Sequence, residues 1–170
     1  AVVYAQMSFV RHKNLGFDKN ALLFIRLNGN ADVVEGYEVF RQTVAASTLV
    51  AGMATSNSLI INGLSSGGAQ TVDRANKPIQ VATARLEVDA DYLSVHGIRL
   101  TAGRNFAPVA PGDTVRQVIL NETAVRKFGW QSAEQAIGKP FLVGNRAGKV
   151  VGVVRDFHFN SLQHRIEPLA

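Results

Sequence analysis

The spacing of apolar residues predicts an amphipathic helix at the start of the chain and a buried strand after it. Residues 2–13 have a helical pattern, and Gly16 is placed to end that helix in the left-handed conformation. The run ALLFIRL at 21–27 is short, apolar and bounded by Asn and Gly residues. This pattern predicts a buried strand.

A second helix follows. Val33, Tyr37, Phe40 and Val44 are spaced by 4, 3 and 4 residues, which places them on one helix face. The helix is expected to run from Asp32, in a D-x-x-E capping pattern, to near residue 47. An apolar run at 49–54 then predicts a strand, so residues 20–54 form a strand–helix–strand (βαβ) unit.

Residues 55–76 are rich in Ser, Asn, Gly and Gln. This composition predicts a long flexible loop or a loose hairpin, with residues 59–61 as one arm. Alternation of polar and apolar residues over 78–88 predicts a half-buried strand after it.

The rest of the chain predicts short strands alternating with short capped helices. Helices are expected at 90–96, capped by Asp89, and at 122–128, capped by Asn121, with a third beginning in a capping box at Ser132 and Gln135. Strands are expected at 98–100, 116–120, 141–143 and 149–154. The mixture is of the α+β class.

Composition narrows the chemistry. The chain has 170 residues, no Cys and a net charge of +5. Without Cys it has no disulfide, no thiolate zinc site and no Cys nucleophile. Its basic residues are scattered singly rather than clustered, so nucleic acid is not expected as a partner.

No run of about 20 apolar residues, the length needed to span a bilayer, occurs in the sequence. The first ten residues, AVVYAQMSFV, are apolar but too short. Composition alone leaves two interpretations equal: a chain cut at a membrane boundary, or an ordinary amphipathic helix packed on the core.

Two glycine-rich motifs resemble a nucleophile elbow and a phosphate-binding loop, but each lacks features that such a site requires. The sequence GLSSG at 63–67 matches G-x-S-x-G, but the residues after Ser65 do not favour the helix that a nucleophile elbow requires. The loop GNRAG at 144–148 lacks the spacing and the Ser or Thr of a phosphate-binding loop, and nucleotide binding is rejected.

Three residues near the end are weak candidates for a metal site. Asp156 and His158 share one face if that segment is a strand, and His164 follows six residues later. The alternating acids Glu87, Asp89 and Asp91 are better explained by helix capping than by acid–base catalysis. No convincing catalytic residue or cofactor site follows from these patterns, and an enzyme is not expected.

Several blocks together carry a family resemblance. In order along the chain they are Gln6, Phe9 and Val10, then NLGFD at 14–18, LLFI at 22–25, VDADYL at 88–93, GI at 97–98, LTAGRNF at 100–106, VILNETA at 118–124, AIGK at 136–139 and VGVVRDFHF at 151–159. This order resembles the MacB-like periplasmic core domain of ABC transporter permeases, within the FtsX-like permease group.

The resemblance implies a fold with a porter-like βαβ lobe and a mixed α/β lobe inserted into it. The chain then divides into a stalk helix (1–16), the porter-like lobe (20–54), a flexible loop (55–76) and a second mixed lobe with return strands (77–170). The first helix becomes the continuation of a membrane helix, which favours the first of the two interpretations above.

The resemblance also implies location and partners. Such domains lie on the periplasmic side of the inner membrane, between transmembrane helices, and have no catalytic residues and no cofactor. A cytoplasmic ATPase drives the permease, which acts as a dimer, and the external domain transmits the motion for export, lipoprotein extraction or signalling. A periplasmic protein partner is a further expectation.

The chain departs from the family pattern at one point, and two alternative functions remain. The family's domain normally has a second βαβ half after the region that ends here, so an excised fragment with an unpaired sheet edge is expected. The alternatives are a periplasmic binding module that presents the 55–76 loop, and a hydrolase that uses Ser65 or a metal at His158.

Overall fold

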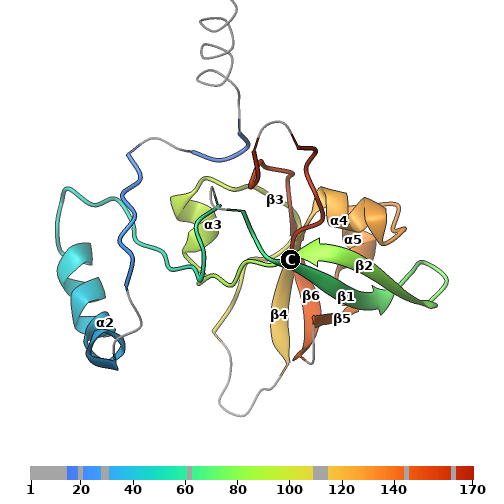
Figure 1. Ribbon diagram of the computed structural model, residues 1–170, viewed down its shortest axis with the longest axis horizontal. Helices are drawn as coiled ribbons and strands as arrows, with labels where there is room; N and C mark the ends of the chain where they lie inside the picture. The colour runs from blue at the N-terminus through green and yellow to red at the C-terminus, as the bar shows by residue number, and fades with distance from the viewer. Residues whose placement is uncertain are drawn as a thin grey trace, which may run out of the picture.

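The centre of the molecule is one mixed six-stranded sheet (Figure 1). The computed structural model describes residues 15–18, 21–27, 31–60, 63–108, 115–143, 146–161 and 164–170. The strands follow the order β2-β1-β5-β6-β3, and β4 also pairs with β6. The helix predicted at 2–13 lies outside the described residues.

Two hairpins and a parallel pair build the sheet. β1 (Ser66–Val72) pairs antiparallel with β2 (Pro78–Ala84), and β5 (Pro140–Val143) pairs antiparallel with β6 (Arg146–Val154). β4 (Arg116–Asn121) runs parallel to β6, and β3 (Leu100–Gly103) runs antiparallel to it. β5 also pairs with β1, which joins the two hairpins.

Residues 168–170 close the sheet at one end. Ala84 at the end of β2 donates its amide to Pro168 O at 2.8 Å, and Ala170 N donates to Ala84 O at 3.0 Å. On the other side, Asn121 N at the end of β4 donates to Leu169 O at 3.2 Å. These bonds bridge β2 and β4, so the backbone groups of Ala84 and Asn121 that form them are not left open to pair with another chain.

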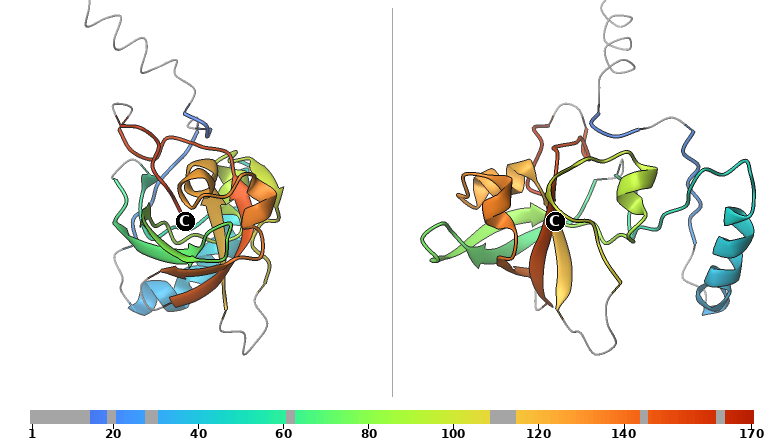
Figure 2. Two further views of the ribbon diagram at one scale, coloured as in Figure 1. Left: turned by 90° about the vertical axis from the view of Figure 1, so that its right-hand side faces the viewer. Right: turned by 180° about the vertical axis from the view of Figure 1, so that it is seen from behind.

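Short helices cover the sheet, and one longer helix stands apart from it. α3 (Tyr92–Val95), α4 (Glu122–Lys127) and α5 (Ala133–Ala136) lie close to the strands, whereas α2 (Ala31–Ala45) lies at the side of the molecule (Figures 1 and 2). An ion pair of 2.9 Å joins Arg41 of α2 to Asp91, next to α3.

The alternation of strand residues produces a hydrophobic cluster on each face of the sheet. On β4, Ile119 packs into one cluster with Tyr92 and Phe157, whereas Leu120 packs into the other with Phe128 and Phe141. β6 repeats the pattern, because Val154 belongs to the first cluster and Val153 to the second. These core strands and the Asn121-capped helix confirm the α+β prediction.

The strands predicted at 21–27 and 49–54 are wrong. Neither segment pairs with another described strand, and most of their large apolar side chains are exposed, by 43% at Leu27, 84% at Leu23 and 94% at Leu49. A strand needs a partner for its backbone groups, and no described segment supplies one here. Only the helix of the predicted βαβ unit forms.

The flexible loop predicted at 55–76 is also wrong over its second part, because residues 66–72 form β1. The expected hairpin is present, but its arms are β1 and β2 rather than 59–61. Gly68 lies opposite Ala82 in this pairing, and the side chain of Gln80 on β2 covers its Cα. The division of the chain into stalk, lobes and loop stays a prediction.

Two leucine substitutions are expected to show that the core contributes to stability and that the unpaired segment 21–27 does not. Leu120→Ala removes a fully buried side chain and is expected to lower the free energy of unfolding by about 3–5 kcal/mol. Leu23→Ala, at an 84% exposed position, is expected to change it by less than about 0.5 kcal/mol. Urea unfolding of both variants measures the contrast, and equal losses would contradict this fold.

Candidate functional site

The described residues nearest the predicted stalk, 15–18, are fastened to the core by backbone hydrogen bonds. His158 N donates to Leu15 O at 2.8 Å, and Asp18 N donates to His96 O at 2.8 Å. Gly16 lies between them with φ +84°, and a Cβ there would lie 2.8 Å from Phe157 Cα. Only glycine fits this close approach, so Gly16 allows residues 15–18 to lie against residues 156–158.

Aromatic side chains reinforce the same contact. The ring of Phe17 meets that of Phe157 edge-on, with centroids 6.4 Å apart and planes at 80°. Phe157 in turn meets Phe159 at 6.0 Å, and both belong to the buried core. Edge-to-face pairs of this kind add to the burial of apolar area. Phe17 therefore anchors the segment in the core.

His96 lies beneath this segment as a buried polar group. It is 4% exposed and stacks on Tyr92 with ring centroids 4.0 Å apart, while Phe17 and Phe24 lie at 6.5 and 6.4 Å. Its Nδ1 lies 3.1 Å from Tyr92 O, and its Nε2 has no hydrogen-bond partner within the described part of the chain. Burial lowers the pKa of His96, although Tyr92 O and Asp89 act in the opposite direction. The ring is thus favoured in its neutral form.

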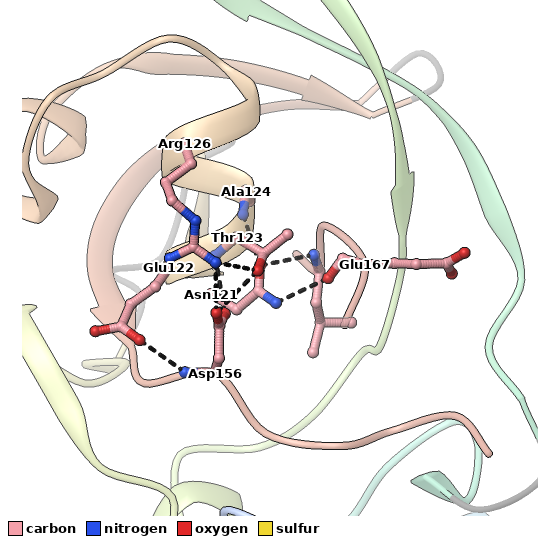
Figure 3. A network of polar contacts seen from close by, with 8 residues as sticks. Asn121, Glu122, Thr123, Ala124, Arg126, Asp156 and Glu167 are labelled. Carbon is pink, nitrogen blue, oxygen red and sulfur yellow. Dashed lines mark hydrogen bonds and ion pairs between the residues drawn. The ribbon is translucent and has the colours of Figure 1, made fainter. Parts of the chain in front are cut away.

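Asp156 connects the end of β6 to the start of α4 (Figure 3). Its carboxylate accepts hydrogen bonds from Thr123 N and Oγ1, both at 2.8 Å, and from Arg126 Nη2 at 2.7 Å. In return, Asp156 N donates to Glu122 Oε2 at 3.1 Å. A carboxylate that accepts a backbone amide and two side-chain donors fixes the helix relative to the strand.

Asn121 continues the connection to residues 167–170. Its Oδ1 caps α4 by accepting from Ala124 N at 2.9 Å and also accepts from Leu169 N at 3.0 Å. Its Nδ2 donates to Glu167 O at 2.8 Å. Asn121 is 1% exposed, so each of these bonds is shielded from water.

We call this assembly the junction: residues 15–18, 96–97, 121–126, 156–158 and 167–170. It forms a connected path from the segment beside the predicted stalk, through β6 and α4, to the residues that close the sheet. Hydrogen bonds and packed rings between these segments resist their displacement relative to one another. The arrangement suits the mechanical coupling of one segment to the sheet.

This arrangement separates Asp156 from the other two candidate metal ligands, His158 and His164, which lie together. Asp156 directs its carboxylate at Thr123 and Arg126, whereas His158 and His164 line a small crevice beside Arg165. Residues 155–159 are not a strand, so the shared face expected for Asp156 and His158 is not formed. Within the described residues, no group of three His, Asp or Glu side chains is placed to hold a metal ion.

The other motifs have structural explanations. Ser65 is exposed immediately before β1, so a strand follows it where a nucleophile elbow has a helix. Asp89 accepts from Thr55 N and Oγ1 at 2.7 and 2.8 Å and from Asp91 N at 3.2 Å, a tie between two segments as well as a turn at the start of α3. Glu87 forms exposed ion pairs with Arg146 and Arg116.

Sequence reasoning identified Asn121 as a cap but missed Thr123 and Arg126. They lie two and five residues after that cap, in the helix that the cap begins. Their partner Asp156 is distant in sequence, 33 residues from Thr123 and 30 from Arg126. No local pattern shows such a contact.

Gly16→Ala is expected to loosen the junction. It forces an L-residue into positive φ and brings its Cβ against Phe157, so the free energy of unfolding should fall by about 2–4 kcal/mol. Gly129→Ala is the control, because Gly129 also has positive φ, +79°, but open space around its Cβ. Urea unfolding should show the smaller loss for Gly129→Ala; the reverse order would contradict the packing of Gly16 on Phe157.

His96 is expected to make stability depend on pH. Because its pKa is lower in the folded state, the unfolded chain binds more protons in the acid range. Stability contributed by neutral His96 is therefore complete above about pH 6.5 and falls by up to about 1.4 kcal/mol per pH unit below it. Urea unfolding between about pH 5 and 7 should show this slope weakened in His96→Phe and retained in His164→Gln, an exposed control. A slope unchanged in His96→Phe would refute the assignment.

Comparisons with known proteins identify the family of this chain. A family model described as the MacB-like periplasmic core domain matches residues 6–165. No curated protein matches the chain. Within the described residues, no helix has the length and apolar character to cross a bilayer.

Two solved structures are similar. The periplasmic region of MacB from Actinobacillus actinomycetemcomitans aligns with a TM-score of 0.50 and 19% identity, over 78% of this chain and 53% of that one. The extracellular domain of the ABC-type transporter YknZ from Gram-positive bacteria aligns with a TM-score of 0.47 and 14% identity, over 78% of this chain and 60% of that one. The chain thus spans about half the length of the MacB region, with which it shares a fold. Because the family match covers most of its length, the chain belongs to the MacB-like periplasmic core domains, the periplasmic part of ABC transporter permeases.

Proposed function

We propose that this domain transmits ATP-driven conformational change from the inner membrane to the periplasm, and that the motion passes into the sheet at the junction. The supporting observation is the fastening of residues 15–18. Their backbone is bonded to His96 and His158, and Phe17 is packed on Phe157. Displacement of this segment would therefore carry β6 with it.

The rest of the junction distributes that displacement. Asp156, directly after β6, is bonded to Thr123 and Arg126 on α4, and Asn121 is bonded to Leu169. β6 itself pairs with β3, β4 and β5, so a movement at its end reaches most of the sheet. A densely packed core transmits such displacements as a body because its interior is hardly compressible.

In this proposal residues 1–16 are the stalk that leaves the membrane, and 20–54 belong to the porter-like lobe. The partners are the flanking membrane helices, a cognate cytoplasmic ATPase acting indirectly, a second permease and a periplasmic protein. The domain itself makes and breaks no covalent bond. The work done outside the membrane is export, lipoprotein extraction or signalling.

The proposal is tested in the full-length permease with its ATPase, reconstituted in lipid nanodiscs. Ala75→Cys in the exposed β1–β2 turn accepts a single donor dye once any cysteines outside this domain are replaced, because the domain itself has no Cys. Energy transfer to acceptor lipids then reports the distance of the sheet from the membrane. ATP is expected to change this distance in the otherwise native protein.

The double substitution Thr123→Val and Asp156→Asn removes the hydroxyl donor and the charge that join α4 to β6. It is expected to reduce the ATP-dependent distance change at least about twofold while the ATPase rate is retained, because the bonds of the junction each contribute about 1–3 kcal/mol. Glu87→Gln, which breaks only exposed ion pairs, is the matched control. No ATP-dependent movement in the native protein, or full movement in the double variant, would overturn the proposal.

A further inference from the structure

A shallow hollow of about 430 Å³ lies at the end of the molecule away from α2 (Figure 1). It opens between the β1–β2 turn and the end of α4, and it is lined by Asp73, Arg74, Ala75, Ile79, Lys127, Phe128 and Gly129. Its volume is in the lower part of the range of ligand sites. The junction does not contribute to it.

The lining of the hollow carries two cations, Arg74 and Lys127, and one carboxylate, Asp73, so its net charge is positive. Arg74 and Lys127 are exposed, and neither has an ion-pair partner among the described residues. The carboxylate of Asp73 does not neutralise them by a direct pair, because its Oδ1 accepts from Ala75 N at 2.8 Å and Lys77 N at 2.9 Å. Lys139 is held beside the turn, its Nζ donating to Asn76 Oδ1 at 3.1 Å.

The walls of the hollow are fixed. Asp73 closes the turn through two further backbone bonds, since Asp73 N donates to Lys77 O at 2.8 Å and Asn76 N donates to Asp73 O at 3.1 Å. Trp130 Nε1 donates to Val72 O at 3.1 Å and so ties the chain after α4 to the end of β1. These bonds hold the backbone beside Arg74 and Lys127 in place, so the conformational cost of binding an anion is mainly the ordering of these two exposed side chains.

The surroundings distinguish between classes of anion. Phe128 and Trp130 are 0% and 3% exposed, so no ring is available here for stacking on a nucleic-acid base. The large apolar side chains exposed among the described residues lie elsewhere, none of them lining the hollow. A membrane-binding surface combines cations with such apolar anchors. A short extended peptide with spaced carboxylates can pair with the two cations and needs neither an exposed aromatic ring nor an apolar anchor.

We propose that this hollow binds an acidic peptide segment of a periplasmic protein, with its carboxylates paired to Arg74 and Lys127. The site is separate from the junction, so the proposal stands or falls independently of the coupling function. It gives the domain a docking point whose selectivity is electrostatic, which governs the rate of encounter and the choice of partner.

Binding is measured by fluorescence anisotropy of a dye-labelled Glu-Glu-Leu-Glu-Glu peptide with the full 170-residue chain. The Arg74→Glu and Lys127→Glu double variant should bind at least about tenfold more weakly, because two attractions become repulsions. Raising NaCl to about 0.5 M should also weaken binding, since exposed charges are screened. A Gln-Gln-Leu-Gln-Gln peptide should not bind measurably.

The matched control is the double variant Arg99→Glu and Arg165→Glu, which makes the same charge change at two exposed positions that do not line the hollow. It should stay within about twofold of the native chain, and thermal unfolding of both variants verifies that they fold. Equal weakening in the two double variants would overturn the proposal, as would binding of the Gln peptide. Binding of vesicles containing phosphatidylglycerol without binding of the acidic peptide would replace it with a lipid surface.

Discussion

The carboxylate of Asp156 joins parts of the molecule that local structure would leave separate. It receives a backbone amide, a hydroxyl and a guanidinium from α4, while its own amide is held by Glu122. The next residue, Phe157, is the surface on which Gly16 and Phe17 rest. The first segment, the central strand and the first turn of α4 therefore meet at two consecutive residues. The coupling proposed for the domain depends on this coincidence.

The same region closes the sheet at one end. Asn121 ends β4, caps α4 and holds Leu169, whose neighbours bond to the end of β2. One buried side chain thus ends a strand, begins a helix and closes the sheet. Because it is buried, loss of any of its partners leaves a polar atom unsatisfied, which costs more than the bond itself contributes.

The remainder of the molecule contrasts with this closure. Residues 21–27 and α2 carry exposed Leu, Phe, Ile and Val side chains, and α2 is joined to the core by the Arg41–Asp91 pair. Such an exposed ion pair stabilises little. The basic hollow lies at the opposite end (Figure 1). A rigid, closed sheet between an apolar region and a basic region is consistent with a domain that transmits motion and offers a docking point.

The sequence by itself determined the α+β class, α2, the caps and stops around α4, the β5–β6 hairpin and the family. These depend on side-chain periodicity and on residues a few positions apart, such as Asn121 with Ala124. Only the tertiary structure decided that 21–27 and 49–54 are unpaired, that 66–72 is a strand, and that Asp156 binds α4 rather than a metal ion. Strand pairing and the hydrogen-bond partners of a carboxylate depend on groups brought together from distant parts of the chain. The local spacing of apolar residues does not predict such contacts.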